Sequence, residues 1–487
     1  MDSGLLEIAR AHAPFLVVIA PIVGAAAIIA VRHAGVCWLI ACLSALAPTA
    51  LAFDLVWRLA ESGVAPLAQL AIATRVDGVG AAAAAVVSLA SALAIFAAGA
   101  LLGERRGPET HLVFALGLCM QGGWCGALYA RDWSALFVAA EGAWLACVAL
   151  IGLRSEKDRA ALNGAMRMLI SGGAASAFLL CGLAFLMRAL GDARIEALAG
   201  VRLAAPAMAA AGASLALLAL AAKAGVAPLH AWVGAALGRA QGNVALIAGV
   251  AGLAGALAVM MRVGAYASVD ARIGPAVSTV LALLGAASAV IGSVQAIGAT
   301  NVQRMAGYAS GAQAGCLLLG VALGSPAGFA SALVQLLAIM AGGAALVGAM
   351  AAGGAKTLAD LDGYGRRAPL ASAAITAAAL SFMGAPLTIG FLGRWRLVEA
   401  SVGAGWWWAA GVVIVVSLAG VFYGGRLIER IYFKRVSAVQ SSEFTARNAL
   451  LAPVLVAAIA AIAIGVAPGE LLRLAAGVAA IATGVGP

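Results

Sequence analysis

The chain has 487 residues, of which 64% are apolar and only 10% are Asp, Glu, Lys or Arg. An average soluble domain is about 45–50% apolar and about 25% charged, so this composition excludes a soluble globular protein. Lys and Arg number 30 against 20 Asp and Glu. This excess does not indicate nucleic-acid binding, because the positive charges are spread over many loops, where in membrane proteins they set orientation.

Apolar runs of helix-spanning length recur along nearly the whole chain, whereas membrane β-strands would be about 10 residues long with alternating polarity. The sequence therefore predicts an all-α integral membrane protein. Runs of about 18–24 apolar residues between polar breaks give fourteen predicted spans, at residues 14–31, 35–53, 79–102, 112–130, 133–153, 167–187, 207–224, 243–262, 274–297, 306–323, 327–350, 371–392, 406–424 and 449–467. Residues 470–487 are too short and Gly-rich to predict a fifteenth span.

The charges in the loops predict how the chain is oriented. Loops after odd-numbered spans carry seventeen of the thirty basic residues, and the opposite side carries twelve. By the positive-inside rule, the odd loops are expected in the cytoplasm and both termini on the outer, periplasmic side of the cell's inner (plasma) membrane. The start MDSGLLEIAR lacks the basic segment of a cleavable signal peptide, so we expect the first span to be retained.

Three ionisable side chains fall inside predicted spans, where each costs roughly 2.5–3.5 kcal/mol on insertion scales and is a functional candidate by default. Glu141 lies in span five, Lys223 in span seven and Arg394 toward the outer end of span twelve. The alternative for Glu141 and Lys223 is a buried ion pair that only sets helix register. The alternative for Arg394 is an interfacial arginine whose side chain extends outward to water.

Spans seven and twelve each contain a proline close to a glycine, in Gly225-Val-Ala-Pro228 and Gly384-Ala-Pro386. Proline opens a helix locally, and paired interruptions of this kind indicate inverted repeats with a path near the midplane. We therefore predict two inverted repeats of five helices. The predicted segments are a three-helix N-terminal part (1–110), a first repeat (111–262), a second repeat (263–424) and a last loop with span fourteen and a short tail (425–487).

His230 follows the first interruption, and histidine titrates in the physiological range. The alternative is a histidine that caps a helix end. Spans eight and nine offer only hydroxyl and amide groups for the rest of a path, at Gln241, Asn243, Ser278, Thr279, Ser288, Ser293 and Gln295.

Four segments of the chain form a recognisable set: RDWSALFVAAE (131–141), KAGVAPLHAWV (223–233), TNVQRMAGYASGAQAG (300–315) and SFMGAPLTIGFLGRW (381–395). In order and spacing they resemble the antiporter-like proton-channel subunits of respiratory complex I, Mrp antiporters and membrane-bound hydrogenases. Within this family the N-type chain of complex I is most similar, on MLISGGAASAFLLCGLAFLM (168–187) and LADLDGYGRRAPL (358–370). Because the sequence ends soon after span fourteen, we expect no counterpart of the long lateral helix of the L-type chain.

The resemblance implies a proton-translocating membrane subunit of NADH-quinone oxidoreductase, with Glu141 and Lys223 as a gating charge pair and His230 near the relay. Burial favours a neutral lysine and a neighbouring carboxylate favours a charged one, so movement of Glu141 would load or release a proton. Flavin, iron–sulfur clusters and quinone are then expected on partner subunits, with no cofactor and no redox chemistry in this chain. The expected partners are other membrane subunits, the lipid bilayer and protons.

Three departures from the family pattern affect this interpretation. Leu253 stands where the family has a span-eight lysine, and Arg394 replaces the span-twelve lysine. An arginine stays protonated, so Arg394 can set a field but is a poor proton carrier. The loop 234–244 lacks the family's acid and prolines. The alternatives are therefore a cation/proton antiporter or hydrogenase subunit, and a structural paralogue that does not conduct.

Overall fold

The computed structural model describes residues 2–31, 33–62, 76–101, 110–153, 159–199, 205–238, 240, 242–435 and 451–483. Within these ranges the regular structure is helical, and β-pairing is confined to two isolated bridges, Asp132–Arg194 and Asn301–Thr357. The helices of the N-terminal part and the first predicted repeat are α1 (Asp2–Ala11), α2 (Ala13–Val31), α3 (Ala34–Ser62), α4 (Gly78–Leu101), α5 (Thr110–Tyr129), α6 (Trp133–Gly152), α7 (Arg159–Leu190), η2 (Ile195–Ala199), α8 (Pro206–Lys223), α9 (Ala231–Ala236), α10 (Gly242–Leu246), the π-helical turn η3 (Ile247–Gly252) and α11 (Leu253–Val269).

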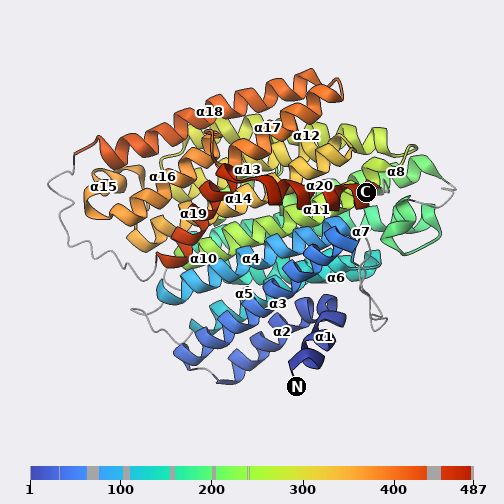
Figure 1. Cartoon of the computed structure of the whole chain (residues 1–487), viewed down its shortest axis with the longest axis horizontal. Helices are drawn as coiled ribbons and strands as arrows, with labels where there is room; N and C mark the ends of the chain where they lie inside the picture. Colours follow the sequence, from blue (N-terminus) through green and yellow to red (C-terminus); the bar gives the residue numbers. More distant parts are fainter. Residues whose placement is uncertain are drawn as a thin grey trace.

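The remaining helices cover the second predicted repeat and the C-terminal part. They are α12 (Gly274–Gly298), α13 (Val302–Ala322), α14 (Pro326–Gly353), η4 (Leu358–Leu361), α15 (Tyr364–Arg367), α16 (Pro369–Met383), α17 (Ile389–Gly403), α18 (Trp407–Tyr432), α19 (Ala452–Val466) and α20 (Gly469–Thr483). Figure 1 shows the long helices stacked side by side, with α1, α2 and α3 at one edge and α18 at the opposite edge.

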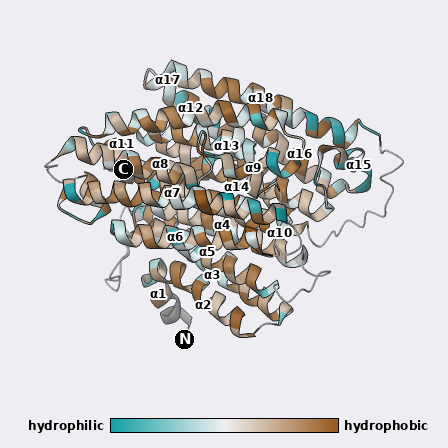
Figure 2. Ribbon diagram, turned by 180° about the vertical axis from the view of Figure 1, so that it is seen from behind, coloured by the Kyte–Doolittle hydropathy of each residue, from teal (hydrophilic) through white to brown (hydrophobic). Residues whose placement is uncertain are grey.

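The outer helices are apolar on their exposed sides, as a chain surrounded by lipid requires. Figure 2 shows apolar residues along most helices and hydrophilic residues gathered at helix ends and in loops such as that around α15. The most buried spans are α11, α13 and α14, whereas α2 and α7 expose most of their length. The centre of the molecule therefore lies between the end of the first predicted repeat and the beginning of the second.

Helices occupy all fourteen predicted spans, which confirms the all-α membrane architecture. Twelve helices are each long and apolar enough to cross a bilayer, and α19 with α20 forms a pair bent by 84°. Predicted span twelve is divided between α16 and α17, which have 15 residues each. Residues 469–483, beyond the last predicted span, also form a helix, α20, which packs against α14 through Ala475. Composition did not predict α20, because a helix held by neighbours needs no spanning length.

Glycines allow the close approach of helices around η3 and α11. A Cβ on Gly252 would lie 2.9 Å from Cys147 Sγ, and one on Gly255 would overlap Trp124. The π-helical turn η3 was not predicted, because its sequence, IAGVAG, has the composition of an ordinary apolar helix.

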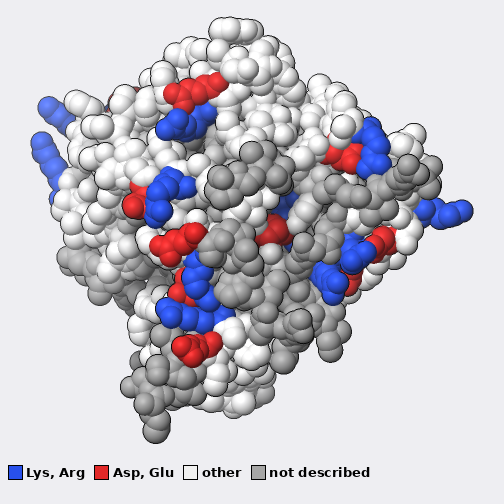
Figure 3. All heavy atoms as spheres, turned by 45° about the vertical axis from the view of Figure 1, so that its right-hand side comes forward, with Lys and Arg blue, Asp and Glu red and all other residues white. Residues whose placement is uncertain are grey.

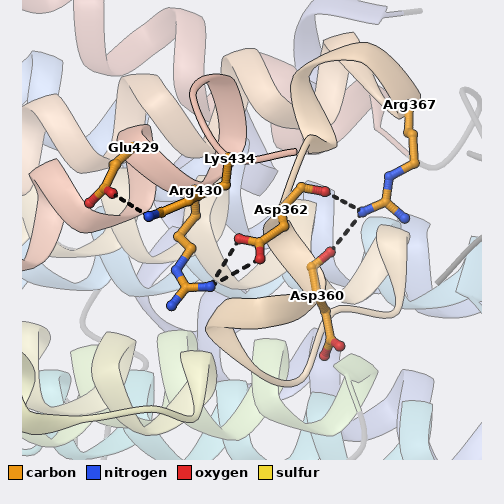
Figure 4. A network of polar contacts seen from close by, with 6 residues as sticks. All are labelled: Asp360, Asp362, Arg367, Glu429, Arg430 and Lys434. Carbon is orange, nitrogen blue, oxygen red and sulfur yellow. Dashed lines mark hydrogen bonds and ion pairs between the residues drawn. The ribbon is translucent and has the colours of Figure 1, made fainter. Parts of the chain in front are cut away.

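Charged side chains on the surface occur mostly in pairs of opposite sign. On the face shown in Figure 3, most blue side chains lie next to a red one. Figure 4 shows a network at the α14–α16 connection, where the carboxylate of Asp362 accepts hydrogen bonds from Arg430 at 3.0 and 3.1 Å. Arg367 donates to the carbonyls of Asp360 and Asp362, and Lys434 pairs with Glu429.

The Asp360 carboxylate also closes the first turn of η4. Burial alone would raise the pKa of Asp360, but hydrogen bonds from the backbone amides of Thr357 and Lys356 outweigh it and lower that pKa. The contacts of Asp360 and Asp362 hold η4 and α15 against the end of α18. The broken helix α16 thus starts from a fixed position.

Candidate functional site

Lys223 and Glu141, predicted from different spans, meet in the structure. Lys223 Nζ lies 2.9 Å from Glu141 Oε1; the lysine side chain is fully buried and that of Glu141 is 18% exposed. Lys223 is the last residue of α8, where the negative end of the helix dipole favours a cation. The pair joins α6 to the end of a helix that stops inside the molecule.

The buried ion pair has further polar partners, as the cost of removing two charges from water requires. Ser176 of α7 donates to Glu141 Oε1 at 2.8 Å and accepts from Lys223 Nζ at 3.0 Å. Its oxygen also lies 2.7 Å from the carbonyl of Gly172. Trp144 places its ring 4.9 Å from Lys223 Nζ, within cation–π range.

Ser176 is a site residue that the sequence did not reveal. It lies in GGAASAF, where a serine is indistinguishable from any other small polar residue in a helix. One hydroxyl has a single proton, so Ser176 can donate either to Glu141 or to the Gly172 carbonyl, but not to both at once. This hydroxyl can therefore leave Glu141 and still hold Lys223.

The interruption after α8 follows from local backbone geometry. Gly225 adopts φ +66°, which a residue with a side chain rarely accepts, and Pro228 has no amide hydrogen to continue the helix. Neighbouring helices satisfy the freed backbone groups, as a membrane interior requires. The amide of Ala227 donates to Ser288 Oγ at 3.2 Å, and Trp232 Nε1 donates to the Ala222 carbonyl at 2.8 Å.

His230 lies beside this interruption but does not act as a side-chain cap of α9. Its Nε2 lies 2.6 Å from Gln295 Oε1 on α12. An amide oxygen only accepts, so Nε2 carries a proton in this contact. Nδ1 is buried without a hydrogen-bond partner among the described residues. A neutral His230 thus keeps a free lone pair that can accept a proton, close to Tyr308 of α13, whose ring centroid is 6.1 Å away.

Arg394 has a different environment from Lys223. Its side chain is almost fully buried and does not extend outward to water, which excludes the interfacial alternative. The guanidinium donates to the carbonyls of Phe382 and Met383 at the end of α16, to Gln313 Oε1 at 3.3 Å and to Ser417 Oγ at 3.0 Å. Among the described residues no carboxylate pairs with Arg394. Arg394 therefore closes the end of a broken helix as a fixed cation.

The polar residues predicted in spans eight and nine make two kinds of contact. Some reach the interruption after α8, and others bond the backbone of their own helix. Ser288 and Gln295 reach the first interruption, whereas Ser293 and Thr279 donate to carbonyls of their own helix. Gln241 lies outside the described residues. Leu253, at the position of the missing lysine, is buried, and a Cβ on Gly225 would lie 3.5 Å from its Cδ2.

A second buried ion pair, Arg262 with Asp77, was not predicted. Arg262 Nε lies 2.6 Å from Asp77 Oδ2, and its Nη1 donates to the carbonyls of Ala127 and Ala130 at 3.2 and 2.9 Å. The pair joins the start of α4 to α11 and the end of α5. Arg262 ends predicted span eight, where a basic residue at a helix end is normally exposed, so the sequence did not indicate its burial. No group of three or more potential metal ligands occurs among the residues described.

Comparison with known proteins gives a consistent result. Residues 130–420 match the family described as NADH:quinone oxidoreductase/Mrp antiporter, TM. Subunit N of NADH-quinone oxidoreductase from Halorhodospira halophila is 31% identical over 411 residues, which cover 82% of this chain and 84% of that protein. Subunit N from Desulforudis audaxviator is 32% identical over 451 residues, 87% of each chain.

Solved structures show the same fold. A chain of respiratory complex I from Thermus thermophilus superposes with a TM-score of 0.77 at 23% identity, covering 94% of this chain and 99% of that one. A chain of the Mrp complex from Dietzia sp. superposes with a TM-score of 0.84 at 23% identity, covering 97% of each.

Proposed function

Because the chain belongs to the transmembrane family shared by NADH:quinone oxidoreductases and Mrp antiporters, we propose that it is a proton-translocating membrane subunit of a NADH-quinone oxidoreductase. The observation that carries the proposal is the buried pair of Lys223 and Glu141 at the end of the broken helix α8. An ion pair inside a membrane is expensive and usually marks a transport path.

The residues of this site can load and release a proton. With Glu141 close, Lys223 is held in its charged form; when Glu141 moves away, burial favours the neutral amine, which releases its proton. Ser176 accepts from Lys223 in the first arrangement and can turn its own proton to the Gly172 carbonyl in the second. His230 offers its free Nδ1 lone pair as an acceptor close to the interruption.

The chain's partners and placement are part of the proposal. We infer that it lies in the plasma membrane with both termini on the outer side, among other membrane subunits of the complex. Flavin, iron–sulfur clusters and quinone would be held by partner subunits, where the redox chemistry occurs. Movement of Glu141, with its partly exposed side chain, would couple that chemistry to Lys223.

A second candidate is a structural paralogue that does not conduct. It is favoured by the fixed charge of Arg394 and by Leu253, because neither can titrate in the second half of the path. A cation/proton antiporter or hydrogenase subunit has the same fold but different partners, which identification of the co-purifying chains would reveal.

The test is proton translocation by the intact complex, purified through this chain and reconstituted in liposomes. NADH and a quinone start turnover, and a fluorescent pH indicator reports acidification of the vesicle lumen. Lys223→Ala is expected to abolish proton transfer, while Lys434→Ala, at an exposed ion pair, leaves it unchanged. Retained translocation in an assembled Lys223→Ala complex would overturn the proposal.

A further inference from the structure

We propose that a water molecule, bound between the π-helical turn η3 and Ser310 of α13, takes the place of the missing titratable group in the centre of this chain. This inference rests on the proposed function. It starts from a small cavity among α13, α14, η3 and the residue after α9, with room for about one water molecule. Figure 1 shows α10, α11, α13 and α14 together in the middle of the helix stack.

The cavity contains polar groups suited to water. Ser310 is buried and lines the cavity, and its hydroxyl has no hydrogen-bond partner among the described residues. Gln303, two turns earlier on α13, also lines the cavity. Ser310 retains 9% exposure beside the cavity, and a water within reach would give its hydroxyl a hydrogen-bond partner. A wholly apolar cavity of this size would be expected to stay dry.

The π-helical turn η3 forms another side of the cavity. Gly249 and Val250 of η3 line the cavity. A turn of this kind inserts one residue into a helix and is found frequently at functional sites. Leu253 follows one turn later on the same side, because residues three and four apart share a helix face. The widened turn therefore places backbone polar groups near the position from which a lysine would reach inward.

The cavity lies against α13, the helix that contacts both interrupted regions. Along α13, Tyr308 contacts His230 of the first site and Gln313 contacts Arg394 of the second. Ser310 lies between these two residues along the helix axis, on the face of α13 that also carries Gln303, Ala306 and Gly307. A water bound there can accept a proton on one lone pair while it releases one of its own, so that a proton passes without net change in the water. This role needs no titratable side chain at position 253.

Two measurements on the intact complex test the site. A high-resolution electron cryo-microscopy map is expected to show a density peak within hydrogen-bond distance of Ser310 Oγ. Ser310→Val, which removes the hydroxyl and fills the cavity with methyl groups, is expected to slow proton translocation about tenfold or more. Ser310→Ala, which leaves space for water, is expected to slow it less. Ser293→Val, at a buried serine that bonds only its own helix, is the control for packing.

The outcomes separate the water site from the proposed function. The water site is overturned if the map shows no density in the cavity, or if an assembled Ser310→Val complex translocates protons at the full rate. In either case Lys223 can still be essential, and the proposed function stands. Full translocation in Lys223→Ala overturns the proposed function, whatever the map shows. The water site is supported if the map shows a density peak, Ser310→Val slows proton translocation and Ser293→Val does not.

Discussion

The two broken helices of this chain are interrupted in the same way, by a glycine with positive φ followed by a proline, but they hold different charged residues. After α8, Gly225 with φ +66° and Pro228 interrupt the helix, and after α16, Gly384 with φ +77° and Pro386 do the same. Lys223 at the first interruption pairs with a carboxylate, whereas Arg394 at the second donates to backbone carbonyls. A lysine paired with a movable acid can change its charge, but an arginine held by carbonyls cannot. The same interruption thus lies beside a lysine–carboxylate pair in one predicted repeat and beside a fixed positive charge in the other.

Lys223→Arg makes the first site like the second and is expected to have the largest effect. The variant keeps a cation opposite Glu141 but removes a group that can release its proton, so proton translocation by reconstituted complex should fall about 10³-fold or more. NADH oxidation in the presence of an uncoupler checks that the complex is intact. Translocation near the native rate would show that charge, and not titration, is what this site requires.

Arg394→Met removes the fixed cation of the second site. The Met383 carbonyl would lose its buried donor, with a cost of about 1–3 kcal/mol. The Phe382 carbonyl would keep its donors from Gln313 and Tyr423. We therefore expect a lower thermal unfolding temperature and less assembled complex, measured by thermal shift in detergent. Arg396→Met, at an exposed ion pair on the same helix, is the matched control. Equal stability of the two variants would contradict the role of Arg394 in closing α16.

Arg394→Lys sharpens the same comparison, because it keeps the charge but loses the planar guanidinium. An ammonium group cannot reproduce all four contacts of Arg394, so its stability should lie between native and Arg394→Met. A Lys variant as unstable as Met would indicate that the number of donors, and not the charge, is decisive.

Ser176→Ala tests the hydroxyl that joins the lysine and the carboxylate. Loss of its hydrogen bonds, worth about 1 kcal/mol, is expected to reduce translocation several-fold and to change its pH profile. Ser176→Thr keeps the hydroxyl and should restore much of the rate. Ser171→Ala, on the same helix but bonded only to the Met168 carbonyl, should behave as native. An unchanged pH profile in Ser176→Ala would argue for packing alone.

Gln295→Leu is expected to have the smallest effect. It removes the acceptor that holds His230 Nε2, a contribution of about 0.5–1.5 kcal/mol, so translocation should fall by a small factor while assembly is unchanged. Ser293→Ala on the same helix serves as the control. A loss as large as that of Lys223→Arg would make His230 an obligatory carrier and not an accessory one.

Hydropathy and local backbone chemistry were sufficient to predict much of the molecule. Long apolar runs must form helices in a membrane, since no water is present to satisfy the backbone, and helices occupy all fourteen predicted spans. The interruptions at Pro228 and Pro386 were also local properties, because proline and glycine act on the backbone within one turn. The three intramembrane charges at Glu141, Lys223 and Arg394 were conspicuous for their energetic cost.

Only the tertiary structure decided which of these groups meet. Ser176 and Lys223 are separated by 47 residues, and their contact depends on how α7 and α8 pack. The same is true of the carbonyl partners of Arg394, the Arg262–Asp77 pair and the helix α20. The composition of one segment specifies whether it enters the apolar layer, but not its rotation or its neighbours. Those follow from side-chain packing between segments distant in the chain.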